Sequence, residues 1–594
     1  MPQQNPPVFD QAVADSLFPL TRDDPPPGVF ELGLVLGGTV SCGAWTAGAL
    51  DFLLQALEAW HDGNQPHNVS IPSVGGASGG AICGAILSLV SRRPVPHITR
   101  SYNDLVADTS NTGNPFWEAW VNQINAADLL STADLDHGEI LSIVNCDIID
   151  SIRDNIAGLD QQPATQARPY FPAPFRLAVT LANLRGIPYR MDTDGDAGWR
   201  GADYIQQDDL ARFAIPNGAD PHTAKRADEF WVDRTLQAPN TDFVDVATLA
   251  ECAVASGSMP VGLKARRLAR PLSHYLYRPH VTPHDPVSDV EWPQPEWDKM
   301  LDPASPLYSF DAVDGGTFNN DPITLVHTAL AGLVGRNPRA PELATRALLM
   351  IDPLATQADD TPPTGTPDLV SVLSNLPGSV VNAARYLTAD LDLMADPAVF
   401  SRFQLVPRRL DMRVTGQLAT VGARFYAFAG FCHRNWRVHD FLLGRLNMQN
   451  MLRTGLILRG SNKLFDAWTL AQRTRWAVDQ NGARFAIGAT THASDYFLPI
   501  LPDVSYDGNG PIAREASRPE LPWPAGVFDP RAEFQDSLTT RLKRLLEALA
   551  GKEVGGIAGW FVGDIIGPQV ASALAGSMVK SFVEELVAAS LLNG

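Results

Sequence analysis

Short apolar runs alternate along residues 28–355 with longer stretches in which apolar residues recur at helical spacing. Residues 32–36 and 69–74 have the apolar character of buried strands. Each leads through a glycine-rich turn into a helical pattern, over residues 45–60 after the first and 81–90 after the second. This order predicts an α/β fold, with a largely parallel sheet and helices on both of its faces.

A composition break divides the chain after the last predicted strand of this pattern. Residues 347–351, Ala-Leu-Leu-Met-Ile, predict a strand that closes the sheet, and the sequence Thr-Pro-Pro-Thr-Gly-Thr-Pro follows at 361–367. Apolar residues beyond this break keep helical spacing. We therefore expect three parts, which are a proline-rich N-terminal segment at 1–27, an α/β domain at 28–360 and a mainly helical C-terminal region at 368–594 packed on it.

Two stretches depart from the alternating pattern. Residues 279–306 hold seven prolines together with Trp292 and Trp297, which excludes a central strand or helix and predicts either a surface loop or an aromatic flap over a site. Residues 554–578 contain a single charge, Asp564, but a proline and several glycines interrupt every apolar run before it reaches spanning length. Paired, packed helices or a surface that touches a membrane fit this stretch better than a membrane span.

Composition narrows the functional classes. With 45% hydrophobic and 19% charged residues, the chain is a globular protein with an ample core. Its formal charge of −20 argues against binding of nucleic acid and against electrostatic docking on anionic lipid. The five cysteines lack C-x-x-C spacing, as expected of buried free thiols in a reducing compartment, and no secretory signal is visible, so we expect a cytoplasmic location with peripheral membrane contact at most. The oligomeric state is not indicated.

The most informative motif is Gly-Ala-Ser-Gly-Gly at residues 76–80, between a predicted strand and a helix of small residues. Strand, G-x-S-x-G and helix are the context of a nucleophile elbow, in which a tight turn leaves the hydroxyl of Ser78 projecting from the edge of the sheet. The start of a helix also favours negative charge that develops beside it. We therefore predict Ser78 as a nucleophile.

Two further turns supply partners for such a serine. Gly37 and Gly38 join the first strand to its helix, where a glycine pair can turn backbone N–H groups toward an oxyanion. Asp314 precedes Gly315 and Gly316 at the end of another predicted strand, and a carboxylate in a poorly solvated cleft can act as a general base. A run of alternating aspartates at 192–196 resembles the start of a calcium loop, but its glycine comes two places early and a hairpin turn explains it better.

The glycine pair, the serine turn and the Asp-Gly-Gly turn occur in the order found in the patatin-like phospholipase family, which this chain resembles. Residues 175–184 are similar to that family's central strand, and residues 253–260 to its small-residue segment that ends in proline. Residues 431–445 resemble a segment of its longer bacterial members. The resemblance covers residues 28 to about 355 and implies a Ser–Asp dyad on an α/β sheet, formed by Ser78 and Asp314.

One stretch departs from the family's Gly-Gly-Gly-x-Arg-Gly loop, because residues 39–42 are Thr-Val-Ser-Cys and include no arginine. Loss of that charge predicts lower activity unless another basic residue takes its place. Backbone N–H groups do not depend on side chains, so the oxyanion hole itself is still expected. Its predicted donors are Gly37, Gly38, Thr39 and Gly79.

These inferences point to a serine hydrolase for acyl esters of lipids, such as a phospholipid or a lysophospholipid, with no metal and no cofactor implied. One alternative is a Ser–His–Asp lipid esterase, which needs a histidine downstream of Asp314. His327 lies in an apolar run, and His433 and His439 lie among charged residues of a predicted salt-bridged helix; His492 is the remaining candidate. A second alternative is a catalytically weak or inactive lipid-binding regulatory protein that keeps the fold.

Overall fold

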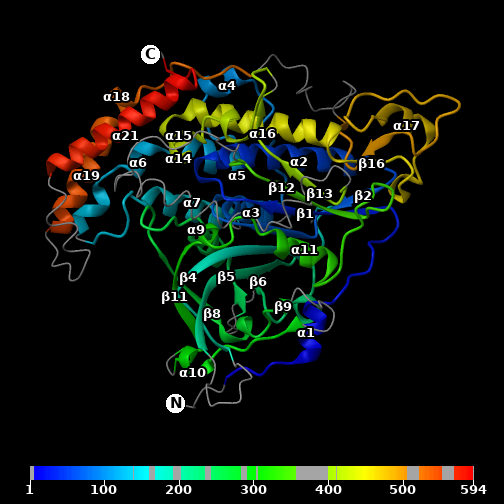
Figure 1. The fold of residues 1–594 in the computed structure, drawn as a ribbon, viewed down its shortest axis with the longest axis horizontal. Coiled ribbons are helices and arrows are strands. Elements are labelled where there is room, and N and C mark those ends of the chain that lie inside the picture. Colours follow the sequence, from blue (N-terminus) through cyan, green and yellow to red (C-terminus); the bar gives the residue numbers. More distant parts are fainter. Residues whose placement is uncertain are drawn as a thin grey trace.

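The computed structural model describes residues 6–592 with the exception of 64, 138, 160–167, 192–201, 234–241, 282–289, 303–304, 356–398, 410, 505–520 and 551–567. Eleven of the described strands form one sheet in the order β13-β12-β1-β3-β4-β5-β6-β7, with β2 beside β1 and with β11 and β8 continuing from β4 (Figure 1). Neighbours from β13 to β4 are parallel, whereas β4 is antiparallel to β5 and β11. The predicted largely parallel sheet with helices is confirmed.

The strands of this sheet are β1 (Val29–Leu36), β2 (Asn68–Ser70), β3 (Ser73–Gly76), β4 (Phe175–Met191), β5 (Ala202–Ile215), β6 (Phe230–Val232), β7 (Phe243–Val244), β8 (Arg266–Pro271), β11 (Leu307–Asp314), β12 (Arg346–Ile351) and β13 (Arg402–Leu405). Small ribbons pair β9 (His280–Val281) with β10 (Val290–Glu291), β14 (Arg408–Arg409) with β15 (Val414–Thr415), and β16 (Ile457–Arg459) with β17 (Phe497–Pro499).

The helices are α1 (Gln11–Leu17), α2 (Gly43–His61), α3 (Gly79–Val90), α4 (Tyr102–Ala107), α5 (Pro115–Trp117), α6 (Ala126–Leu129), α7 (Asp147–Gly158), α8 (Pro221–Ala224), α9 (Val246–Ser256), α10 (Trp297–Met300), α11 (Ile323–Ala331), α14 (Arg424–Ala427), α15 (Ala429–Cys432), α16 (Arg434–Thr454), α17 (Leu470–Trp476), α18 (Pro530–Glu533), α19 (Gln535–Ala550) and α21 (Pro568–Ala588). Short turns named below are η1 (Val40–Cys42), η2 (Glu118–Gln123), η3 (Ala133–His137) and η6 (Gly315–Thr317).

Both faces of the parallel part are covered because successive residues of β1 point to opposite sides. Val35 joins Val326 and Leu330 of α11 in one apolar cluster, whereas Leu34 and Leu36 belong to the larger core that α2 and α3 share. A strand covered on both faces is apolar throughout, which explains the continuous run in the sequence.

The C-terminal half is packed into this core backbone to backbone. A Cβ on Gly48 of α2 would stand 1.9 Å from the carbonyl oxygen of Phe441, and one on Gly444 of α16 would stand 2.0 Å from that of Trp45. The two helices therefore touch where each has a glycine, and Arg445 of α16 forms a fully buried ion pair with Asp51 of α2. Among the described helices, only the stretch Val40–His61 has the length and apolarity of a membrane span, and 94% of its most apolar window is buried inside the protein.

One sequence expectation is wrong, and one of two open alternatives is excluded. The strand at 347–351 does not close the sheet, because β13, from beyond the composition break, pairs in parallel with β12 on its outer side. Trp292 and Trp297 do not form a flap over the site: Trp292 lies within 6 Å, centroid to centroid, of the rings of Phe9 and Phe18, in the cluster formed around α1. Both tryptophans instead pack against the apolar residues around the N-terminal helix α1.

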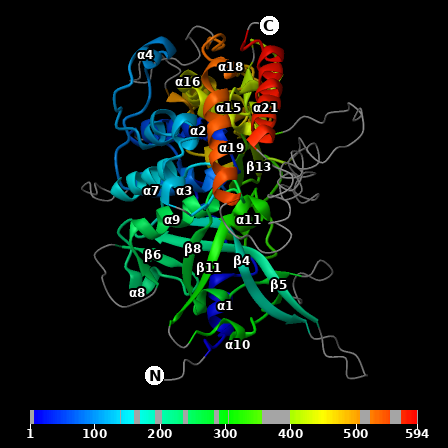
Figure 2. The same ribbon diagram turned by 90° about the vertical axis from the view of Figure 1, so that its left-hand side faces the viewer.

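The C-terminal helices α19 and α21 lie side by side against the helical layer (Figure 2). Arg541 of α19 is fully buried and binds Asp134 together with the backbone carbonyls of Ser131 and Ile143. Pairing of packed helices was one of the two expectations for residues 554–578, of which 554–567 lie outside the described residues. The predicted boundaries of the three parts stay predictions, because the break at 361–367 also lies outside them, as does the calcium-like run at 192–196.

Candidate active site

The serine turn has the geometry of a strained elbow. Strand β3 ends at Gly76, α3 begins at Gly79, and Ser78 between them has φ 53° and ψ −130°, a backbone conformation that costs a non-glycine residue about 1–3 kcal/mol. A Cβ on Gly80 would stand 2.3 Å from the carbonyl oxygen of Leu36, and one on Gly76 would stand 2.8 Å from Cα of Ala81. Only glycine fits at both flanking positions, which explains the G-x-S-x-G spacing.

Strand register brings Asp314 to the serine. The last residue of β3, Gly76, pairs with Val179 of β4, and the last residue of β11, Asp314, pairs with Leu181 of the same strand. Since β5 occupies the other side of β4 at these positions, β3 and β11 end face to face along one side of it. Two turns that are 236 residues apart in sequence thus meet at one point.

The hydroxyl of Ser78 donates a hydrogen bond to Oδ2 of Asp314 at 2.9 Å, and the other carboxylate oxygen accepts the N–H of Gly316 at 2.7 Å. The last residue of α9 and the segment after it fix both backbones: Oγ of Ser256 accepts the N–H of Ser78, and the carbonyl of Ser258 accepts the N–H of Asp314, each at 2.9 Å. Sequence reasoning placed this segment in the family pattern without a role for either serine.

Burial raises the pKa of the Asp314 carboxyl group. Desolvation raises the pKa of Asp314 to about 6, and the hydrogen bonds from Gly316 and Ser78 oppose that rise. No described cation forms an ion pair with Asp314. The carboxylate is therefore ionised at neutral pH yet more basic than an exposed aspartate, which suits a general base.

The four expected oxyanion donors differ in whether their N–H groups already have an acceptor. Gly37 donates its N–H to the carbonyl of Ile351 and Gly38 donates to that of Asn320, both at 3.3 Å, so neither N–H is free for an oxyanion in this arrangement. Within the described part of the chain, no acceptor is bonded to the N–H of Thr39, Val40 or Gly79. A Cβ on Gly79 would stand 2.0 Å from Oγ1 of Thr39, so the two turns are in contact. Of the four predicted donors, Thr39 and Gly79 thus have an N–H without an acceptor in the described structure, and so does Val40, which the sequence did not indicate.

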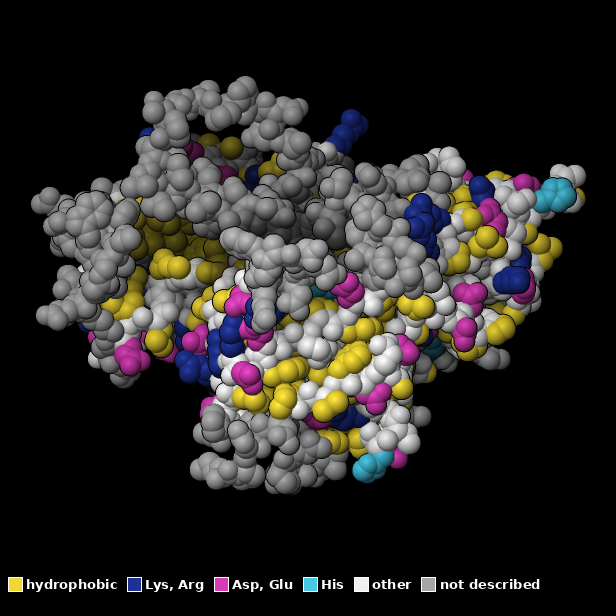
Figure 3. Space-filling model, turned by 60° about the horizontal axis from the view of Figure 1, so that its bottom comes forward, with side chains coloured by type: hydrophobic (Ala, Val, Ile, Leu, Met, Phe, Trp, Pro, Cys, Tyr) yellow, Lys and Arg dark blue, Asp and Glu magenta, His cyan; other side chains and the backbone are white. Residues whose placement is uncertain are grey.

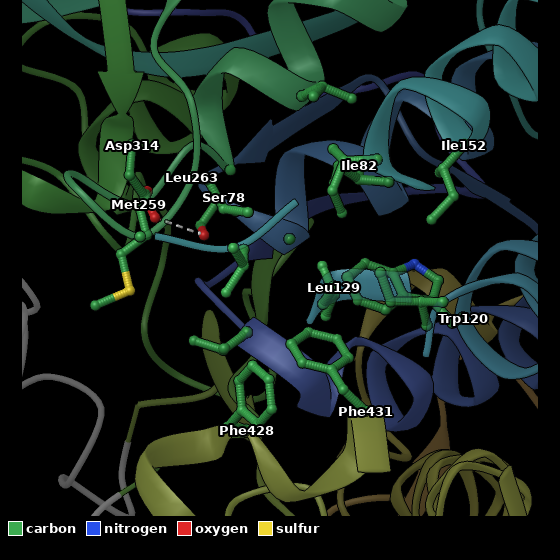
Figure 4. Close-up of a pocket in the computed structure, with 18 of the residues that line it drawn as sticks. Ser78, Ile82, Trp120, Leu129, Ile152, Met259, Leu263, Asp314, Phe428 and Phe431 are labelled. Atoms are coloured by element: carbon green, nitrogen blue, oxygen red, sulfur yellow. Dashed lines mark hydrogen bonds between the residues drawn. The ribbon is translucent and has the colours of Figure 1, made fainter. Parts of the chain in front are cut away.

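A cavity of about 190 Å³ opens beside Ser78 and Asp314. Its wall is almost entirely apolar, and it combines residues from α3, η2, α7 and the segment after α9 with two phenylalanines from the C-terminal half (Figure 4). The larger side chains of this wall are Ile82, Trp120, Leu129, Ile149, Ile152, Met259, Leu263, Phe428 and Phe431. Such a cavity accepts a hydrocarbon chain attached to a group that reacts at Ser78.

The candidate histidines lie elsewhere. No histidine lines the cavity in the described part of the chain. His433 caps α16 and burial lowers its pKa, while His439 is buried with Nδ1 2.8 Å from Asp440 and Nε2 2.9 Å from Arg409. The other two, His327 and His492, stand on α11 and on an exposed loop.

The stretch that lacks the family arginine is uncharged, and three of its four residues, Thr39, Ser41 and Cys42, are buried. Burial and the nearby Asp440 raise the pKa of the Cys42 thiol well above its usual range, and Sγ lies 3.9 Å from Oγ1 of Thr420. The described residues include no group of three His, Cys, Asp or Glu side chains that could hold a metal ion. On the face drawn in Figure 3, acidic and basic side chains are interspersed among the described residues, and hydrophobic side chains line a hollow on the left.

Comparison with known proteins relates the chain to a family, to a bacterial protein and to a solved structure. A family model described as patatin-like phospholipase matches residues 34–327. A Sinorhizobium fredii (strain NBRC 101917 / NGR234) protein, named "Uncharacterized protein y4iI", is 26% identical over 539 residues, which cover 83% of this chain and 72% of its own length. The crystal structure of VipD from Legionella pneumophila aligns with 72% of this chain and 70% of its own at 12% identity, with a TM-score of 0.19.

Proposed function

Because residues 34–327 form a patatin-like phospholipase domain, we propose that the chain is a serine hydrolase that cleaves acyl esters of lipids with a Ser78–Asp314 dyad. The family implies hydrolysis of lipid acyl groups. The hydrogen bond of 2.9 Å between Ser78 Oγ and Asp314 Oδ2, at the mouth of an apolar cavity, is the observation that carries the proposal.

In the first half of the reaction, Asp314 takes the hydroxyl proton as Ser78 Oγ bonds to the ester carbonyl carbon. The carbonyl electron pair moves to oxygen, and the resulting oxyanion accepts hydrogen bonds from the N–H groups of Thr39 or Val40 and of Gly79. When the oxyanion collapses, the bond to the alcohol oxygen breaks, and the alcohol leaves with the proton held by Asp314. The acyl group remains on Ser78.

In the second half, Asp314 takes a proton from water, whose oxygen attacks the acyl carbon. Collapse of the second oxyanion returns that proton to Ser78 and releases a carboxylic acid. The apolar wall supports a fatty acyl chain as the part of the substrate inside the cavity, because the wall offers hydrocarbon contacts and almost no hydrogen-bond partner.

A fluorophosphonate probe tests this proposal. We expect the probe to label the full chain at one residue, which peptide mapping identifies as Ser78, and we expect Ser78→Ala to abolish both labelling and hydrolysis of a short-chain nitrophenyl ester. Ser88→Ala is the matched control, because Ser88 is a buried serine on α3 whose hydroxyl donates to the carbonyl of Gly84 in its own helix. Activity of Ser78→Ala within a few-fold of wild type would exclude Ser78 as nucleophile.

The same experiment separates the alternatives. A wild-type protein that binds fatty acid but neither reacts with the probe nor hydrolyses esters is the lipid-binding regulatory protein. A labelled protein whose activity also disappears on substitution of one histidine is the Ser–His–Asp esterase.

A further inference from the structure

Ser41 connects the oxyanion loop to the C-terminal half of the chain. The side chain is buried in η1, one residue after Val40. Its hydroxyl donates to the carbonyl of Gly422 at 2.9 Å and accepts the N–H of Gly430 at 3.0 Å. A Cβ on Gly430 would stand 2.6 Å from Ser41 Oγ, so the approach requires glycine there. The hydroxyl therefore both donates and accepts a hydrogen bond, and its two backbone partners lie 381 and 389 residues away in the sequence.

The partner segment is itself anchored. Asp440 of α16 accepts the N–H groups of Val421 and Gly422 at 3.0 and 2.7 Å. Arg437 of α16 donates to the carbonyl of Gly430 at 3.0 Å. Because α16 is packed backbone to backbone on α2, residues 421–430 form a fixed support for Ser41, and they lie outside the matched family domain.

The loop that Ser41 follows is strained. Val40 has φ 46°, which is rare for a β-branched residue and costs about 1–3 kcal/mol. Such a conformation persists only where neighbouring contacts impose it. The N–H groups of Thr39 and Val40 have no acceptor in the described structure, and their direction depends on that conformation. Within the loop, Oγ1 of Thr39 donates to the carbonyl of Val40 at 3.1 Å, and the two hydrogen bonds of Ser41 tie the loop to the distant half of the chain.

We propose that Ser41 is a positioning residue for the oxyanion hole, held in place by the C-terminal segment 421–430. The inference rests on the proposed function. It also accounts for the stretch that lacks the family arginine: where a charge is absent, a buried hydroxyl and a segment from the distant half of the chain hold the loop. Ser41 touches no substrate, and acts through the backbone of Thr39 and Val40.

The test compares Ser41→Ala with Ser88→Ala in the full-length protein. Loss of a direct oxyanion donor lowers kcat about 10²–10³-fold, so an indirect loss should lower kcat by about 10- to 100-fold while KM changes less than about threefold. Ser88→Ala removes a buried serine hydroxyl that bonds within its own helix, and it should leave kcat unchanged.

A trifluoromethyl ketone with a short alkyl chain separates positioning from general destabilisation. Addition of Ser78 Oγ to its carbonyl carbon creates an oxyanion while Asp314 takes the proton, so its affinity reports on the hole. We expect Ser41→Ala to lower the affinity for the ketone by the same factor as it lowers kcat/KM. The affinity for decanoate, which forms no tetrahedral adduct, should stay within about twofold of the wild-type value. Weakening of both ligands alike would overturn the proposal.

Gly430→Ala gives an independent perturbation, because its methyl group must displace the Ser41 hydroxyl. The same loss of kcat and ketone affinity is expected, and the result decides the matter should Ser41→Ala fail to fold. If either variant folds and keeps full activity, the role of Ser41 is overturned, whereas the proposed Ser78–Asp314 dyad is unaffected. A wild-type protein without esterase activity or probe labelling overturns both proposals.

Discussion

Substitution of Asp314 by Asn should destroy activity and stabilise the protein at the same time. The pKa of this carboxyl is raised from 3.8 to about 6, because burial penalises the ionised form. A folded-state pKa above the unfolded value means that the group's contribution to stability is fully present below about pH 4 and is lost as the pH rises through about 6. At pH 8 the ionised carboxylate therefore costs stability, on the order of 3 kcal/mol for a shift of roughly two units.

Asparagine removes that charge and keeps the shape of the side chain. Its oxygen can still accept the N–H of Gly316, so a large part of the cost should be relieved. We expect the Tm of Asp314→Asn to exceed that of wild type by a few degrees at pH 8, and the difference to vanish toward pH 4. Hydrolysis of a nitrophenyl ester should fall by about 10²–10⁴-fold, the usual contribution of a general base.

The wild-type pH–rate profile is a second test of Asp314 as the general base. With a pKa of about 6, the ionised fraction of Asp314 is about 0.9 at pH 7 and about 0.1 at pH 5, so kcat/KM should fall about tenfold over that interval. An imidazole titrates in the same range, so the position of the limb cannot distinguish a dyad from a triad. The limb should instead survive substitution of each candidate histidine, which are His327, His433, His439 and His492.

Asp311→Asn is the matched control. Asp311 lies on the same strand three residues earlier, and its side chain, which is 44% exposed, pairs with Arg267 at the surface, where an ion pair contributes little. Its loss should change neither activity nor Tm appreciably. A drop in Tm of Asp314→Asn at pH 8 would mark Asp314 as a structural carboxylate, and activity within a few-fold of wild type would exclude it as the base.

Two further predictions concern the C-terminal half. Phe431→Ala enlarges the apolar cavity, so preference in kcat/KM should shift about tenfold toward longer acyl chains across a nitrophenyl ester series, and an unchanged preference would place the chain elsewhere. Deletion of residues 554–594 uncovers the aromatic cluster in which Phe425 stacks on Phe582 at 4.3 Å, so the protein should aggregate or lose its cooperative melt. A stable truncated protein that cleaves soluble esters but has lost activity on vesicles would instead show that these helices serve membrane contact.

The sequence allowed prediction of those parts of the site that depend on local turn chemistry. Gly76 is demanded by a contact with Ala81 inside the turn, whereas the carbonyl oxygens that exclude a Cβ at Gly80 and Gly315 belong to Leu36 and Thr180 of neighbouring strands. Such constraints leave a residue pattern that can be read without a structure. The fold class was predictable for a similar reason, since a strand covered on both faces must be apolar throughout.

Contacts between segments that are far apart in the chain leave no residue pattern in the sequence and could not be predicted from it. Strand β13 has four residues, of which two are polar, and only its pairing with β12 makes it a strand. Phe428 and Phe431 are ordinary aromatic residues of a helical stretch until the fold places them in the cavity wall. Likewise, nothing in a glycine pair reveals that the N–H groups of Gly37 and Gly38 are taken by the carbonyls of Ile351 and Asn320.

These distant contacts bear on what the family domain can do by itself. Residues 34–327 hold Ser78 and Asp314, but β12 and β13 extend their sheet, α16 fills the core beside α2, and the C-terminal half completes the cavity wall. Excision at residue 327 would leave the outer edge of β1 unpaired and the helical face of α2 exposed to water. The match to the family therefore marks where the serine and aspartate turns lie, whereas the sheet, the core and the cavity wall all include residues of the C-terminal half.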